Sequence, residues 1–172
     1  MIGRTQLSVV EHDEELQAQT AQEKNADEAE IRRVVDEIDN ACDAKDWEKC
    51  RSFFADEVDV DFTSLAGGEP SRVKAGDLIG AWDANLFAEK KSFHMRSNHR
   101  VEIKGSRAEV YSKGYAFNLL ESGEVSGLWE VWGEYVHTLE RGAGGWKVSG
   151  MTLNVAHKRG DDRVREFQKE QK

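Results

Sequence analysis

The sequence predicts an α+β protein in which a curved, cone-shaped antiparallel sheet wraps around N-terminal helices. Apolar residues recur at helical spacing through the first half of the 172-residue chain. The second half alternates apolar and polar residues in four segments, which are separated by short turns that contain glycine. Helices and strands that are segregated along a chain are typical of the α+β class. We therefore expect four long strands to fold over the helices and to enclose a pocket.

The chain is expected to hold one domain, over residues 26–158, with a charged tail over residues 159–172. Residues 1–25 are rich in charged side chains and predict a weakly ordered, polar N-terminal arm. The domain begins with a helix that Asp27 can cap. The apolar stripe of this helix consists of Ile31, Val34, Val35, Ile38, Ala41 and Cys42. Asp39 and Asp43 lie one turn apart, close to the edge of the stripe.

Two more helices and one strand are expected before the main sheet. The helices are predicted at residues 47–55 and 73–87, and the strand at residues 57–64, where apolar and polar residues alternate. Residues 66–70 form a turn that holds the only proline. The strands of the second half are predicted at residues 92–103, 107–120, 127–141 and 145–157, and the turns between them suit hairpins.

Composition and charge limit the classes of partner and the cell compartment. The chain has 33 acidic and 24 basic residues and a net charge of −9, which argues against a nucleic-acid or membrane-surface partner. Cys42 and Cys50 are too few for a disulfide framework, so two reduced and buried thiols are expected. The N-terminus lacks the apolar run of a signal peptide. These features predict a cytoplasmic protein.

The strand at residues 92–103 carries the most useful chemistry. At a period of two residues, one of its faces is entirely polar, although the strand lies within sheet-forming sequence. That face holds His94, Arg96, Asn98, Arg100 and Glu102, and the opposite face holds Met95, Ser97, His99, Val101 and Ile103. We expect the polar face to meet an internal cavity, where Asp43 of the first helix reaches His94.

An Asp43–His94 pair suits proton abstraction. A carboxylate that accepts a hydrogen bond from one imidazole nitrogen leaves the other nitrogen free to act as a base. Elimination, dehydration, isomerisation and activation of water all use such a base. The alternative is structural: Asp43 pairs locally at the helix end, and His94 is only a hydrogen-bonded cavity residue. The histidines show no metal-ligand spacing and the glycine turns no phosphate-loop pattern, so neither metal nor cofactor is predicted.

The pocket wall is expected to come from aromatic residues. Trp82 on the third predicted helix, and Tyr115 and Trp132 on the strands, are the candidates, because an apolar site with a few polar groups is typical of small-molecule binding. Asn98 either donates a hydrogen bond to a ligand carbonyl or satisfies the backbone at a β-bulge.

Four short motifs resemble a known superfamily. They are Ala-Cys-Asp-Ala-Lys-Asp-Trp at residues 41–47, Phe-Phe-Ala-Asp-Glu-Val at 53–58, the segment from Trp132 to Arg141, and Gly-Trp-Lys-Val at 145–148. In this order they resemble the cone-shaped α+β barrels related to nuclear transport factor 2, also called cystatin-like, and among these the SnoaL-like branch. The resemblance covers about residues 28–157 and implies this fold.

A narrower resemblance is to enzymes of the scytalone dehydratase and hexachlorocyclohexane dehydrochlorinase type. It implies that Asp43 and His94 are their Asp–His pair. Three positions differ: Ile38 stands in place of a lysine and Met151 in place of an arginine of the dehydrochlorinase, and Cys42 in place of a tyrosine of the dehydratase. Met151 is accordingly expected in the substrate-binding wall.

Two functions from different classes are consistent with these residues. The first is a cofactor-independent lyase, such as a dehydratase, or an isomerase that acts on a small, partly hydrophobic molecule, with His94 as general base and Asp43 as its orienting partner. The second is a non-catalytic ligand-binding or protein-interaction module, because fold alone does not decide function. A homodimer or homotrimer is expected through the outer sheet face, with Trp129, Val131 and the strand around His99 as contributors.

Overall fold

The computed structural model describes residues 3–121, 123 and 125–168, and the chain divides into two compact units, residues 1–30 and 31–172. The remaining residues, which include parts of the predicted arm, of one hairpin turn and of the charged tail, lie outside the described residues. The helices are α1 (Gly3–Ala44), α2 (Trp47–Ser52), α3 (Thr63–Ala66), α4 (Ala75–Asn85) and α5 (Asp162–Glu166). Among the described residues, no helix is both long and apolar enough to cross a membrane.

Helix α1 is longer than the sequence predicts. It begins at Gly3, so the first unit is helical where a weakly ordered arm is predicted. Between residues 4 and 30 the chain has no proline and no glycine and is rich in glutamate, glutamine and alanine, which favour a helix without needing a core. The helix ends at Ala44. The next residue, Lys45, has a left-handed φ of 59°, and the amide of Asp46 donates to the carbonyl of Ala41 over 2.9 Å.

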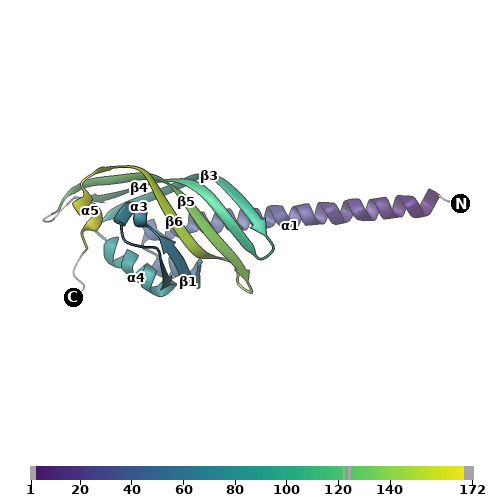
Figure 1. Ribbon diagram of the computed structural model, residues 1–172, viewed down its shortest axis with the longest axis horizontal. Coiled ribbons are helices and arrows are strands. Elements are labelled where there is room, and N and C mark those ends of the chain that lie inside the picture. The colour runs from purple at the N-terminus through teal and green to yellow at the C-terminus, as the bar shows by residue number, and fades with distance from the viewer. Residues whose placement is uncertain (1–2, 122, 124, 169–172) are drawn as a thin grey trace. The chain divides into compact units, whose positions relative to one another are not determined.

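Six strands form one sheet in the order β2-β1-β6-β5-β4-β3. The strands are β1 (Phe54–Asp61), β2 (Ser71–Lys74), β3 (Lys91–Lys104), β4 (Arg107–Leu120), β5 (Gly127–Gly142) and β6 (Gly145–Gly160). Strands β3 to β6 are long, bent ribbons joined as an antiparallel meander (Figure 1), whereas β1 pairs with β6 in parallel. The α+β class and the curved sheet are confirmed, and the sheet is mixed rather than wholly antiparallel.

The region before α4 differs most from the predicted elements of the second unit. Residues 71–74, of which the last two are predicted as the start of a helix, form β2, which pairs with β1 in an antiparallel register. Lys74 remains extended and marks the start of α4, so this helix begins two residues later than predicted. The short helix α3 replaces the end of the predicted strand at residues 57–64 and reaches only the first residue of the predicted turn. Four-residue elements bury too few side chains to leave a periodic signal.

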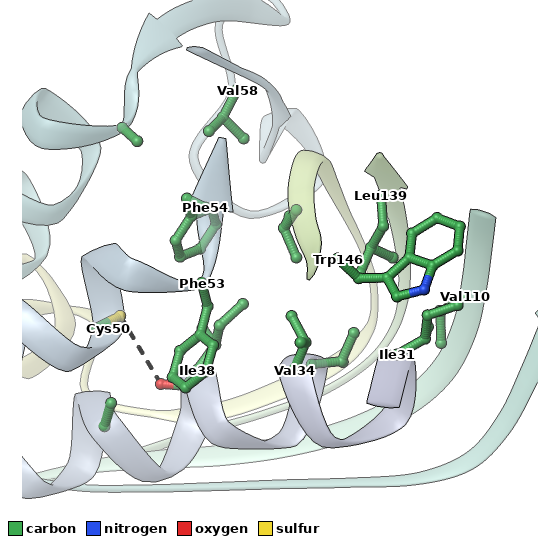
Figure 2. Close-up of a cluster of buried hydrophobic side chains, with 14 of the residues drawn as sticks. Ile31, Val34, Ile38, Cys50, Phe53, Phe54, Val58, Val110, Leu139 and Trp146 are labelled. Carbon is green, nitrogen blue, oxygen red and sulfur yellow. Dashed lines mark hydrogen bonds between the residues drawn. The ribbon is translucent and has the colours of Figure 1, made fainter. Parts of the chain in front are cut away.

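One apolar cluster joins the second unit's part of α1 to the sheet (Figure 2). The predicted stripe of α1 packs against α2, β1 and the inner residues of β4, β5 and β6. Ile31, Val35 and Val58 are fully buried there, and Trp146 is 1% exposed. Each Å² of apolar surface removed from water contributes about 25 cal/mol to stability, so this cluster is a main source of the stability of the fold.

A second apolar cluster lies toward the C-terminal end of the chain. It contains Ala116, Leu120, Trp129, Val131 and Val164. Val164 belongs to α5, so the beginning of the predicted charged tail is a packed helix. The buried ammonium of Lys90 donates to the carbonyl of Phe167 over 2.6 Å and fixes the end of α5.

A β-bulge in β3 changes which side chains face inward. Ser97 pairs with Lys113, but Arg100 pairs with Tyr111, so β3 has one residue more than β4 at this point. Asn98 takes a φ of 57°, which asparagine tolerates better than most residues. An extra residue moves every later side chain to the other face.

The bulge corrects the predicted division of the strand. His94 and Arg96 face inward as predicted. Val101 and Ile103 also pack on the inner cluster, whereas the predicted inner residues Asn98, Arg100 and Glu102 are exposed. Of the two predicted roles of Asn98, the structure therefore has the one at a β-bulge.

The left-handed backbone at Asn98 can be tested by substitution. We expect Asn98→Val to lower the free energy of unfolding by about 1–2 kcal/mol, because a β-branched residue is strained at positive φ. Asn98→Gly removes the same side-chain contacts without this strain and should stay close to wild type. Urea denaturation measures both. Equal losses in the two variants would show that the bulge does not depend on the backbone conformation of residue 98.

Candidate functional site

The end of α1 presents a row of acidic side chains to β3. Asp36, Asp39 and Asp43 are spaced three and four residues apart, so they share one face of the helix. Each lies within ion-pair distance of a basic side chain on the inner face of β3. The pairs follow in reverse order along helix and strand: Asp43 pairs with His94, Asp39 with Arg96, and Asp36 with His99.

Asp43 accepts three hydrogen bonds, two from His94 and one from Ser92. Its Oδ1 accepts hydrogen bonds from His94 Nδ1 over 2.8 Å and from Ser92 Oγ over 2.9 Å. Its Oδ2 accepts from the backbone amide of His94 over 2.6 Å. Because a carboxylate only accepts, Nδ1 carries the proton, and Nε2 is left as the basic nitrogen.

The charge of Asp43 is stabilised by these bonds. Burial opposes ionisation, but the hydrogen bonds and the positive potential of His94, together with the Ser92 hydroxyl, outweigh it and hold the pKa of Asp43 below its usual value. Lys45 donates to Ser92 Oγ over 2.7 Å and supports the arrangement. Asp43 is thus a carboxylate at neutral pH, as an orienting partner of a base must be.

Arg96 and Asp39 form a buried ion pair beside the first pair. The side chain of Arg96 is 2% exposed, and its Nη2 donates to Asp39 Oδ1 over 2.7 Å. Burial opposes the charge, but Asp39 outweighs it and raises the pKa of Arg96. The guanidinium lies 3.8 Å from the ring centroid of Tyr135. A Cβ at Gly114 would lie 2.6 Å from this ring, so a glycine is required there.

His99 completes the contact between helix and strand. Its Nε2 lies 3.0 Å from Asp36 Oδ1, and its side chain is only 10% exposed. The sequence predicts His99 on the face opposite to His94. The bulge at Asn98 brings it to the same side, toward α1.

A cavity of about 230 Å³ opens beside His94, between the two apolar clusters. The polar lining residues are Asp39, Asn85, His94, Arg96, Asn118, Tyr135 and Arg165, and the remaining wall is apolar. The apolar wall includes Ile38, Cys42, Phe62, Leu65, Trp82, Leu86, Ala116, Trp129, Val131, Met151 and Leu153. This volume lies just below the roughly 300–1,000 Å³ of typical ligand pockets.

The predicted site residues fall into two groups. Trp82 and Met151 line this cavity together with His94. Tyr115 and Trp132 lie on the outer face of the sheet, where their ring centroids are 5.1 Å apart and Tyr115 donates to Glu130. With the exposed Asn98, these two residues stand away from the cavity. The prediction that they face inward is wrong. Tyr115 pairs with Met95 rather than with His94, and Trp132 pairs with Tyr115, so both side chains lie on the face opposite to His94.

Several polar residues of the cavity are not among the predicted site residues, although Arg96 is predicted to face inward. Asp39 lies one helical turn before Asp43, and Arg96 lies two residues after His94 on the same strand face. These spacings were the available signal. Asn118, which is 6% exposed, sits on β4 two residues beyond the partner of His94. Nothing in its local sequence sets it apart.

Other chemistry near the cavity is limited. The pKa of Cys42 is raised far above its usual range by its contact with Cys50, 3.5 Å away, and by burial, so it is no thiolate nucleophile. Within residues 3–121, 123 and 125–168, no group of three or more histidine, cysteine, aspartate and glutamate residues is placed to hold a metal ion. A larger hollow of about 490 Å³, lined by charged residues such as Arg72 and Glu57, lies away from the dyad.

His137 on β5 is a further inward histidine, next to Tyr135 of the cavity wall. His137 is fully buried, its ring is stacked on Tyr135 at 5.9 Å, and neither ring nitrogen has a hydrogen-bond partner among the described residues. Burial, with the positive potentials of Arg96 and His99, holds the pKa of His137 well below 6.5. It is therefore neutral at physiological pH.

Comparison with known families now adds to this geometry. Residues 23–152 match the SnoaL-like domain, which is well over half of the chain. The chain belongs to this SnoaL-like family. The resemblance predicted from the four sequence motifs is thereby confirmed. Among curated proteins, none matches the chain at a significant level.

Solved structures share the fold. The Kfla4162 protein of Kribbella flavida is 25% identical, with a TM-score of 0.77 over 84% of this chain and 99% of that chain. A provisionally assigned scytalone dehydratase from Novosphingobium aromaticivorans is 16% identical, with a TM-score of 0.66 over 80% of this chain and 90% of that chain. A LinA-type hexachlorocyclohexane dehydrochlorinase from Novosphingobium barchaimii is 16% identical, with a TM-score of 0.66 over 81% and 93%. The last two similarities establish the fold, not the reaction.

The neutral state of His137 predicts a pH dependence of stability. Its folded-state pKa lies below the value of 6.5 for the free side chain, so below about pH 6.5 the unfolded chain binds a proton that the folded chain does not. The stability that neutral His137 contributes is present above that pH. As pH falls below it, the free energy of unfolding decreases by up to about 1.4 kcal/mol per pH unit. Urea denaturation at several pH values should show a shallower loss in His137→Leu. The exposed His157→Leu is the control, and a His137→Leu slope equal to wild type would contradict the assignment.

Proposed function

We propose that this protein is a cofactor-independent lyase or isomerase, most simply a dehydratase, that removes a proton from carbon in a small, partly hydrophobic molecule. The observation that carries the proposal is the 2.8 Å contact from His94 Nδ1 to Asp43, made by a histidine that also lines the cavity. His94 acts through Nε2 as the general base. Asp43 fixes its tautomer and stabilises the imidazolium that forms.

The surroundings of the pair support this role. The wall of the cavity is mainly apolar, which limits water and strengthens electrostatic effects on a reacting group. No serine or threonine is among its lining residues, and the Cys42 thiol stays protonated, so a nucleophilic mechanism has less support than proton abstraction. We place the activity in the cytoplasm, because Cys42 and Cys50 are both free thiols only 3.5 Å apart, as expected in a reducing compartment.

A non-catalytic ligand-binding role is the second candidate. It is favoured by Ile38, Cys42 and Met151, which line the cavity at the positions where the dehydratase and dehydrochlorinase resemblance implies polar groups. A cavity that has lost such groups can still hold an apolar ligand. The experiment below separates the two roles, because binding needs no proton transfer.

Proton abstraction can be measured without knowing the substrate. The full chain is incubated in D₂O with small cyclic and aromatic ketones and β-hydroxy ketones, and proton NMR follows the loss of the signal next to the carbonyl. We expect exchange with at least one compound, and a fall of roughly 100-fold or more in His94→Gln, because a general base contributes about 10²–10⁴-fold. Asp43→Asn should lower the rate at least about tenfold.

The matched control is His157→Gln, the same substitution at an exposed histidine of the outer face. It should exchange at the wild-type rate. Undiminished exchange in His94→Gln would refute the general-base role. Ligand binding by the wild type without exchange of any compound would favour the binding module.

We also propose that the protein is a homodimer or homotrimer that associates through the outer sheet face. Phe93 and Met95 are 45% and 52% exposed there, and Phe93 stacks on Phe117 with ring centroids 5.8 Å apart. The charged Glu130 and Arg159 of this face already pair with each other, so a second copy of the same surface can cover them without leaving either charge unpaired. Trp129 and Val131, predicted as contributors, instead line the inner cavity.

Light scattering after size-exclusion chromatography tests this association. We expect a mass two or three times the 19.4 kDa of one chain. Met95→Glu should shift the protein toward monomer, because it places a charge in the apolar contact. Lys104→Glu, an exposed charge change at the end of the same strand, is the control. A monomeric wild type, or an oligomer that Met95→Glu leaves intact, would refute the interface.

A further inference from the structure

The buried Arg96 has an unused hydrogen-bond donor. Its Nη2 and Nε are directed to Asp39, but Nη1 has no hydrogen-bond partner among the described residues, although the side chain is 2% exposed. More than about 90% of buried polar groups have a partner, and leaving a donor unsatisfied costs roughly 1–3 kcal/mol. A charged donor that stays unsatisfied in the resting protein is therefore a candidate for contact with a ligand.

The position of Arg96 limits which ligand this is. Arg96 and His94 are two residues apart on the inner face of β3, and both line the same cavity. The carboxylate of Asp39 takes one edge of the guanidinium, and the ring of Tyr135 covers one of its faces. Because Arg96 lines the cavity, its remaining edge, which carries Nη1, is the one left for a ligand oxygen.

Asn118 gives a second, independent observation. It lines the same cavity from β4, is 6% exposed, and its Oδ1 has no hydrogen-bond partner within the part of the chain that the structure describes. The register places it diagonally across from His94, whose direct partner is Ala116. The base therefore has an unsatisfied polar group on either side, which indicates a ligand with oxygen functions rather than a hydrocarbon.

We infer that Arg96 holds the carbonyl oxygen of the substrate and that the substrate class is a small cyclic or aromatic carbonyl compound, ionised next to the carbonyl by His94. This inference rests on the proposed function and names the group that stabilises the charge. Arg96 is a catalytic residue in this assignment, because it touches the oxygen on which negative charge develops.

The reaction step balances without a co-reactant. His94 Nε2 takes the proton from the carbon next to the carbonyl, and the C–H electron pair forms the C=C bond of an enolate while the carbonyl π pair moves to the oxygen held by Arg96. In a β-hydroxy ketone, the carbonyl then re-forms and the C–O bond to the hydroxyl breaks. The leaving oxygen takes the proton from the His94 imidazolium, and water and an unsaturated ketone result.

A stable compound that resembles the enolate can test whether Arg96 stabilises a negative charge on oxygen. 4-Nitrophenolate carries the oxyanion of an enolate on a planar ring, and 4-nitrotoluene has the same shape with a methyl group in its place. Equilibrium dialysis with the full chain gives the affinity for each. We expect the wild type to prefer the phenolate at least tenfold. In the double variant D39N/R96M, which removes both charges and so leaves no unpaired charge, this preference should fall at least tenfold, with 4-nitrotoluene affinity changed less than threefold.

Arg100→Met is the matched control. Arg100 lies on the same strand with its guanidinium 4.2 Å from the ring centroid of Tyr111, but it faces outward. Its loss should leave the preference unchanged. Circular dichroism checks the fold of each variant. Should the double variant not fold, Arg96→Lys, which keeps the charge but loses the guanidinium edge, should lower the preference at least threefold.

The outcomes separate this inference from the proposed function. A phenolate preference that survives both Arg96 substitutions, or that is absent in the wild type, overturns the role of Arg96 even where His94-dependent exchange is seen in D₂O. A preference that depends on Arg96, in a protein whose exchange does not depend on His94, supports the oxyanion site and refutes the general base.

Discussion

The contact between the acidic edge of α1 and the basic inner residues of β3 is the constraint on which the site depends. Asp43 alone holds the imidazole, the amide of the same residue and a neighbouring hydroxyl. Hydrogen bonds to a carboxylate have directional requirements, so they fix the end of the helix against one position of the strand. Apolar packing of the α1 stripe supplies stability but allows more than one register. The charged contacts select the register in which base and cavity meet.

The cavity exists because the two apolar clusters do not pack directly against each other along its length. One cluster joins α1 to β1 and the sheet, and the other gathers around α5. The pair of Arg96 and Asp39 lies between them. A buried ion pair is poor at adding stability, but removing one partner costs about 3–5 kcal/mol. Apolar side chains in its place could close the gap, so the pair keeps open a space that packing alone would tend to fill.

The order and approximate bounds of the long strands could be predicted because alternation over fourteen residues is a strong signal. Strand β4 has the predicted bounds, 107–120. Asp43 and His94 were also found from sequence and are hydrogen-bonded in the structure. What could not be predicted depends on register. The bulge at Asn98 adds one residue without changing composition, and it decides the faces of His99 and Arg100. The phase of β4 and β5 relative to β3 likewise decides that Tyr115 and Trp132 face outward.

The bulge has a consequence for how this strand can change during evolution. Before Asn98, the inward positions carry the polar groups of the cavity. After Asn98, the inward positions are His99, which pairs with Asp36, and then Val101 and Ile103, which pack on the main core. A single irregular residue thus divides β3 into a segment that can diversify with the ligand and a segment held constant by packing. Gain or loss of that one residue would exchange the two patterns, so a small insertion there has a larger effect than most substitutions.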